Sequence, residues 1–150
     1  MKVFSIALVA LLLLFCTTAS AQQGNLDPKW LEFNTGMVEA FGAQKIDKAR
    51  EQAEKALEYL KSKNMLETVE AATTFNNIGM VHYYSQDFAK AANYLVQALA
   101  LRIKLLGPDH IEVGATCRNL AEIYKNQALI LLKEAERIQK LHEGDSTKNQ

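Results

Sequence analysis

Three residues that follow the Gly107–Pro108 break, Asp109, His110 and Glu112, are of types that can transfer protons or bind a metal ion. A histidine between two carboxylates suits either chemistry. The corresponding stretch that begins at Glu67 reads ETVE in place of DHIE, so the acidic frame recurs while the histidine does not. This recurrence favours a helix start, in which Asp109 accepts a backbone N–H and Glu112 reaches back as in a capping box. His110 has no role in that interpretation.

Other patterns that would indicate an enzyme or a metal site are also weak. His82, His110 and His142 are widely separated in the sequence, whereas a helical metal site uses ligands three or four positions apart. The sequence contains neither a Gly-rich phosphate loop nor a G-x-S-x-G element. We therefore predict a protein that is not an enzyme and that needs no cofactor and no metal.

An internal repeat organises the chain, with a period of 42 (119 minus 77). Asn77, Ile78 and Gly79 recur as Asn119, Leu120 and Ala121. The same shift aligns small or apolar residues of the middle copy with those of the first, namely Ala91 with Ala49, Leu95 with Ala53 and Ala98 with Ala56. Self-similarity at such a period is typical of stacked repeat architectures. The repeats are expected at about 30–71, 72–113 and 114–150, within a domain that spans 22–150.

Each repeat is expected to form two helices. In the middle repeat, one apolar stripe follows helical spacing up to His82, and after the break at Ser85–Asp87 a second stripe begins at Phe88. Pro28 lies ahead of the first expected repeat and Pro108 lies at the junction of two repeats, where a helical array tolerates them. The sequence thus predicts an all-α fold, an α-α superhelix of about three stacked antiparallel helical hairpins.

The pattern of large and small positions resembles the tetratricopeptide repeat. It is carried by Phe75, Ile78, Gly79, Phe88, Ala91, Leu95 and Ala98, and the long period with LGPDH in the linker resembles the kinesin light chain variety. The third repeat departs from this pattern, because Lys133 and Lys140 stand where the second has Ala91 and Ala98. We interpret it as a polar terminal cap that keeps one apolar stripe, namely Leu131, Ala135, Ile138 and Leu141.

Repeat positions also give expectations for two reactive side chains. Cys117 aligns with Phe33 and Phe75, which predicts a buried, unreactive thiol. His82 aligns with Tyr124, which favours a packed histidine over a metal ligand.

The resemblance implies that the first helices line a concave face that binds protein. The residues of those helices that lie off the packing stripe would bind an extended peptide, and the repeated asparagines could donate to and accept from its backbone. The alternative is that these residues are merely exposed polar side chains. The candidate binding residues are Asn76, Asn77, Met80, Tyr83, Tyr84, Arg118, Asn119, Glu122 and Lys125, with Asn126 beside them.

The N-terminus has the parts of a secretory signal peptide: Lys2, an apolar run to about Cys16, and Ala19-Ser20-Ala21. The run is shorter than the ~20 residues of a membrane span. Cleavage after Ala21 would leave 22–150, with no membrane span and one cysteine, which forms no intramolecular disulfide. The near balance of 17 basic and 17 acidic residues argues against a nucleic-acid partner.

Two functions fit these observations. The first is an exported adaptor, periplasmic or secreted, that binds a protein segment on its concave face. The alternative is a small structural subunit that docks through its terminal helices on a larger cell-envelope complex. The two differ in where substitutions would disrupt binding.

Overall fold

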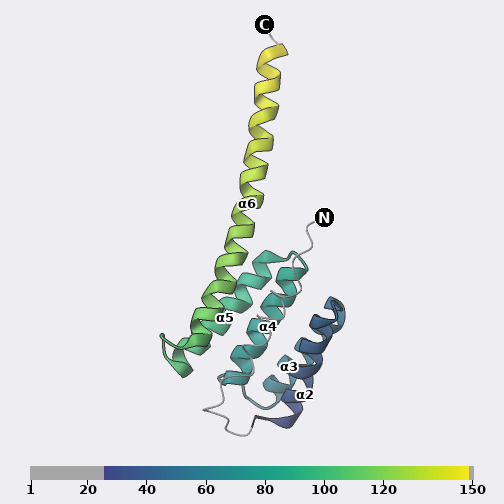
Figure 1. Ribbon diagram of the computed structural model, residues 1–150, viewed down its shortest axis with the longest axis vertical. Helices are drawn as coiled ribbons and strands as arrows, with labels where there is room; N and C mark the ends of the chain where they lie inside the picture. Colours follow the sequence, from purple (N-terminus) through teal and green to yellow (C-terminus); the bar gives the residue numbers. More distant parts are fainter. Residues whose placement is uncertain (1–25, 149–150) are drawn as a thin grey trace.

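The computed structural model describes residues 26–148, and side chains within residues 26–142, as a stack of helices without a strand (Figure 1). The expected signal peptide, residues 1–21, lies outside the described residues. The helices are α2 (Pro28–Gly42), α3 (Ile46–Ser62), α4 (Val69–Tyr84), α5 (Phe88–Leu106) and α6 (Ile111–Lys148). This order and content confirm the predicted all-α fold.

Two antiparallel hairpins, α2–α3 and α4–α5, form the body of the stack, and each element packs against the next along the chain (Figure 1). The turns within the hairpins are built alike. Gln44 and Gln86, which hold the same repeat position, both adopt the left-handed backbone conformation, with φ of 58° and 62°. The repeat in the sequence is therefore a repeat in backbone geometry as well, and the expected superhelix of stacked hairpins is confirmed.

The starts of α4 and α6 are capped at one repeat position. Thr68 Oγ1 accepts from the Ala71 backbone N–H at 3.2 Å, and His110 Nδ1 accepts from the Glu112 backbone N–H at 3.2 Å. The His110 carbonyl also accepts the first backbone hydrogen bond of α6, from Val113 at 2.9 Å. The prediction of a helix start was right, but the expected cap at Asp109 was wrong by one residue. A ring nitrogen can accept the helix's free N–H as a hydroxyl does.

The contact between α4 and α5 depends on small residues, as the sequence predicted. A Cβ added to Gly79 would lie 2.9 Å from Leu95 Cγ and 3.1 Å from the Ala91 carbonyl oxygen. Ala91, Leu95 and Ala98 are fully buried on the facing side of α5. The two helix backbones therefore approach as closely as a glycine allows.

A buried ion pair joins the second hairpin to α6. Arg102 is 7% exposed, and its Nε lies 3.2 Å from Glu112 Oε2. Its guanidinium also donates to Thr116 Oγ1 at 2.5 Å and to the Glu112 carbonyl at 3.3 Å. Glu112 was expected to reach back to the helix start, and this expectation was wrong because Arg102 is the stronger, charged partner.

The predicted third hairpin does not form. α6 continues from Ile111 to Lys148 without a turn, and its C-terminal half projects beyond the body (Figure 1). Residues 127–129, Gln-Ala-Leu, stand where the second hairpin turns, and all three favour a helix. The expected apolar stripe of the cap is therefore uncovered, with Leu131 71% and Leu141 58% exposed.

The continuous helix also explains why the prediction for Cys117 was wrong. The thiol is exposed, whereas its counterparts Phe33 and Phe75 are half-buried. Phe75 packs against Tyr94 of α5, the second helix of its own hairpin, with ring centroids 6.2 Å apart. Cys117 lies on a helix whose chain does not turn back, so no second helix of the same chain covers it within the described residues.

Candidate protein-binding face

The first helices of the successive repeats, α2, α4 and α6, lie side by side and carry the predicted binding residues. Three side-chain hydrogen bonds connect them, each between residues 43 positions apart. Asn77 donates to Asn34 at 2.9 Å, Asn119 donates to Asn76 at 3.2 Å, and Asn126 donates to the Tyr83 hydroxyl at 3.1 Å. Neighbouring first helices therefore pack at a constant offset of 43 residues, which is one residue more than the period of the sequence repeat.

The asparagines form a continuous amide ladder, which we define as Asn34, Asn77, Asn76 and Asn119. Asn76 Nδ2 donates to Asn77 Oδ1 at 3.4 Å and so links the two inter-helix bonds. We expected Asn77 and Asn119 to be available for a ligand, but they bond within the protein. A primary amide has two N–H donors and an oxygen that accepts twice. Each of the amides on α4, which are half-buried, keeps hydrogen-bonding capacity beyond the ladder.

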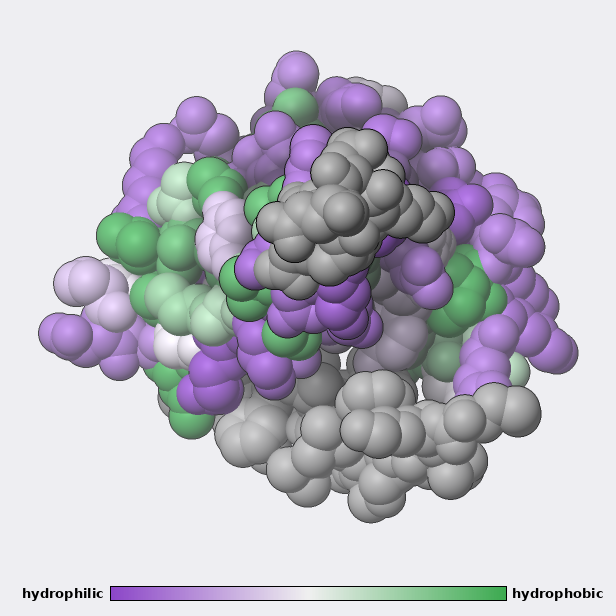
Figure 2. Space-filling view, turned by 90° about the horizontal axis from the view of Figure 1, so that it is seen from above, coloured by the Kyte–Doolittle hydropathy of each residue, from purple (hydrophilic) through white to green (hydrophobic). Residues whose placement is uncertain are grey.

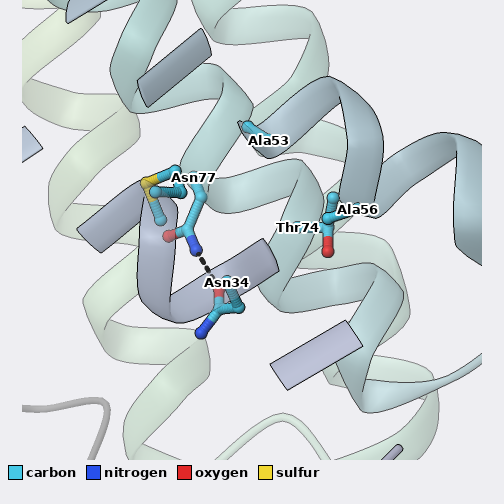
Figure 3. Close-up of a pocket in the computed structure, with 6 residues that line it drawn as sticks. Asn34, Ala53, Ala56, Thr74 and Asn77 are labelled. Atoms are coloured by element: carbon cyan, nitrogen blue, oxygen red, sulfur yellow. Dashed lines mark hydrogen bonds between the residues drawn. The ribbon is translucent and has the colours of Figure 1, made fainter. Parts of the chain in front are cut away.

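A small hollow lies beside the ladder, between α2, α3 and α4 (Figure 3). Figure 3 shows the Asn34–Asn77 hydrogen bond across it, with Ala53 and Ala56 of α3 nearby. No part of it is large enough to hold a water molecule, whereas pockets for small molecules begin at about 300 Å³. The face is therefore suited to surface contact along its length and does not enclose a ligand. The hollow is lined by Asn34, Met37, Ala53, Ala56, Thr74 and Asn77.

The apolar candidates are partly engaged in packing. Met80 and Tyr83 pack against a buried hydrophobic cluster that includes Leu120 and Ile123 of α6. Tyr84 stands edge-on to Phe41 of α2, with ring centroids 4.8 Å apart, and is 41% exposed. Burial raises the pKa of both tyrosine phenols, and Glu122 raises the pKa of Tyr83 further. Both hydroxyls therefore remain protonated donors at neutral pH.

The charged candidates lie together on α6. Arg118, Glu122 and Lys125 are exposed, and Lys125 Nζ lies 3.4 Å from Glu122 Oε2. The other carboxylate oxygen of Glu122 accepts from Asn126 at 3.1 Å. Because Glu122 offsets Lys125, Arg118 contributes most of the positive charge that these three residues give to the face.

The residues that suggested chemistry have structural partners. His82 stacks on Tyr94, with ring centroids 5.7 Å apart and planes 6° from parallel. Burial lowers the pKa of His82, and the nearby Asp87 partly opposes this effect. The packed role predicted for His82 is confirmed. Within the described residues, no group of three His, Cys, Asp or Glu side chains is placed to hold a metal ion.

Asn34 was absent from the predicted site, although the sequence contained a signal for it. Asn34 and Asn76 hold one repeat position, just as Asn77 and Asn119 do. The ladder alternates between these two positions because the helices pack at an offset of 43 residues. Of the nine predicted residues, Asn76, Asn77 and Asn119 belong to the ladder, and Met80 and Tyr83 also serve the core.

Residues 70–141 match the sequence model of the tetratricopeptide repeat family. The match covers α4, α5 and most of α6. Repeats of this family generally mediate protein–protein interactions and act as non-enzymatic scaffolds. A comparison with curated proteins found no match to this chain. Among the described residues, no helix combines the length and the apolar character needed to cross a membrane.

Proposed function

Taking the tetratricopeptide repeat match as the premise, we propose that this protein is a non-enzymatic adaptor that binds an extended polypeptide on the α2–α4–α6 face. The observation that carries the proposal is the amide ladder across all three helices. Amides pair with a peptide backbone irrespective of its sequence, and here they are spaced by a fixed helix register. The exposed ring of Tyr84 and the Arg118 cation would add side-chain contacts.

The hydrogen bonds within the ladder would lower the entropy cost of binding a ligand. Bonds within the ladder fix the orientation of each amide before a partner arrives, so less side-chain entropy is lost on binding. Ser, Asp or backbone carbonyl groups of a ligand could then meet amide hydrogens that already point away from the ladder. Arg118 favours an acidic or neutral polar segment over a basic one.

Truncation of two ladder amides tests the binding site. We expect Asn77→Ala/Asn119→Ala to weaken binding of a peptide selected from a displayed random library against the wild-type protein. Each lost amide leaves ligand groups unpaired and costs about 1–3 kcal/mol of binding free energy. The dissociation constant, measured by titration calorimetry, should rise about tenfold for each site. The helical circular dichroism of the variant should stay native.

The matched control removes a similar pair of amides from α5. Asn93 and Gln97 are exposed and joined by a 2.7 Å hydrogen bond, and they lie outside the α2–α4–α6 face. Asn93→Ala/Gln97→Ala should bind as the wild type does. Equal binding by both double variants would reject the proposed face, and loss of binding in Arg137→Ala/Lys140→Ala alone would favour docking through the end of α6.

We also propose that the protein is exported and acts in the periplasm or outside the cell. The support is the order of Lys2, the apolar run and Ala19-Ser20-Ala21 at the N-terminus. Intact-mass analysis of the protein recovered outside the cytoplasm should show a chain that begins at Gln22. A membrane-bound product that retains Met1 would contradict the proposal.

A further inference from the structure

The projecting half of α6 exposes a row of apolar side chains. Leu131 is 71%, Leu132 60% and Ile138 45% exposed, and two small residues, Ala128 and Ala135, lie on the same side of the helix. Leu129, Ile130 and Leu141 are also exposed, on other sides of the helix, so this half of α6 has not buried the apolar surface that would stabilise it. Figure 2, seen from above, also shows apolar patches on the side of the molecule where Figure 1 places α5 and the base of α6.

This row carries the packing pattern of a second helix. A constant shift of 37 residues (128 minus 91) aligns four packing residues of α5 with four residues of α6: Ala91 with Ala128, Leu95 with Leu132, Ala98 with Ala135 and Leu101 with Ile138. At the longer shift of the sequence repeat, Ser85 corresponds to Gln127. The third repeat therefore contains the helix that should follow its turn, but it lacks the counterparts of residues 86–90. That segment includes Gln86, whose left-handed conformation makes the turn in the second hairpin.

The other half of α6 exposes the surface that such a helix would cover. In the second hairpin, Gly79 lies against Leu95 and Ala91 of α5, and Phe75 and His82 contact Tyr94. The counterparts on α6 are Cys117, Ala121 and Tyr124. All three are exposed, Tyr124 at 51%.

The two exposed surfaces lie on one side of α6. The helical period places Cys117, Ala121 and Tyr124 in line with Ala128, Leu132 and Ala135. They cannot meet within one chain, because the helix between them is continuous. In an antiparallel pair of α6 helices, each of the two surfaces on one copy would contact the complementary surface on the other copy. The two contacts would be identical, as in a two-fold dimer.

We propose that α6 pairs with α6 of a second copy of this chain, so that each C-terminal half completes the third hairpin of the other copy. We call the contact surface the α6 seam. The dimer follows from the missing turn and is independent of the proposed peptide-binding function. The seam consists of Cys117, Ala121, Tyr124, Ala128, Leu131, Leu132, Ala135 and Ile138.

The second hairpin sets the register of the pairing. Since Gly79 faces Ala91 and Leu95, Ala121 should face Ala128 and Leu132 of the second copy. The two helices then cross near Lys125 and Asn126, and alanines lie on either side of the crossing. Small side chains at these points permit the close approach that Gly79 permits between α4 and α5.

The available surface and charges are compatible with a dimer. The seam side chains, taken on both copies, offer roughly 1,200 Å², at the lower end of stable interfaces. The register also places Arg118 within one turn of Glu136 of the second copy, on the same flank of the seam. The two Lys125 side chains approach near the axis, where Glu122, 3.4 Å from Lys125 in each copy, offsets the repulsion.

Sedimentation velocity of the chain without residues 1–21, at about 100 µM, tests the proposal. The wild type should sediment as a dimer. Leu132→Glu should be a monomer, because the two-fold axis repeats the substitution and the dissociation constant rises about 1,000-fold. The matched control is Ile130→Glu, at a leucine-sized residue that is 53% exposed on the opposite side of the helix. It should remain a dimer.

An insertion tests the structural cause. Placing Gln-Asp-Phe-Ala-Lys, the sequence of residues 86–90, after Gln127 should restore the turn and give a helical monomer. Thiol labelling then separates the monomers: Cys117 should react slowly in the wild-type dimer and in the insertion variant, and rapidly in Leu132→Glu. A monomeric wild type, a wild type that instead associates with lipid vesicles, or a dimer that survives Leu132→Glu would each overturn the proposal.

Discussion

Replacing Gly79 with leucine is expected to unfold the protein. A Cβ at this position would already lie 2.9 Å from Leu95 Cγ and 3.1 Å from the Ala91 carbonyl, and the backbone oxygen cannot rotate away. We expect Gly79→Ala to lower the free energy of unfolding by about 1–3 kcal/mol. The larger leucine side chain should exceed the few kcal/mol of stability that a small domain holds. Circular dichroism, followed through a urea titration, measures both effects.

Gly36 of α2 provides the matched control for Gly79. Its added Cβ would meet only the side chain of Gln52, at 3.3 Å, and that side chain is flexible. Alanine has a helix propensity about 1 kcal/mol more favourable than glycine. Gly36→Ala should therefore be neutral or stabilising. If both glycine-to-alanine variants behaved alike, the close approach of α4 and α5 would not determine stability.

Replacing Arg102 with alanine is expected to cost about 3 kcal/mol of unfolding free energy. The substitution leaves the Glu112 carboxylate, whose side chain is 21% exposed, and the Thr116 hydroxyl without their partner between α5 and α6. A buried charge without its counter-ion is the main source of this cost. Urea titration of the variant, compared with the wild type at the same protein concentration, gives the difference.

Two further variants test whether the loss of stability in Arg102→Ala comes from breaking the buried ion pair or from removing any positive charge. Lys104, two positions after Arg102 on α5, pairs with Glu67 at 2.6 Å, but both side chains are more than half exposed. Lys104→Ala should change stability little. Arg102→Met/Glu112→Leu should recover much of the loss, because it removes both charges at once. A loss in Arg102→Ala no larger than that in Lys104→Ala would show that the pair contributes little.

The two hairpins could be predicted from the sequence because their apolar stripes and their small residues report packing within one chain. The residue types at Gly79, Ala91 and Leu95, for example, are explained by the close contact between α4 and α5. The helix starts were found but misassigned by one residue, since acidic residues usually precede helices and a histidine cap is rare. The frame recurred at Glu67 and Asp109, while the capping atoms belong to Thr68 and His110.

Two features depended on information that the sequence repeat does not contain. The amide ladder requires an offset of 43 residues between neighbouring first helices, which is a property of three-dimensional packing. The third hairpin was predicted by extending the repeat through a segment that lacks a turn. Lys133 and Lys140 at expected alanine positions were the signal of that deletion, and they were interpreted as surface adaptation of a cap.

The amide ladder also has a direction. Asn119 donates to Asn76, Asn76 to Asn77 within α4, and Asn77 to Asn34, so both bonds between helices are donated towards the N-terminal repeat. Within residues 26–142, the ladder therefore begins with the Asn119 oxygen, an acceptor, and ends with the Asn34 amide nitrogen, a donor. Unlike ends give the row of amides a polarity, with partial negative charge at α6 and partial positive charge at α2. A peptide backbone is itself polar, so its two orientations along this face differ in energy.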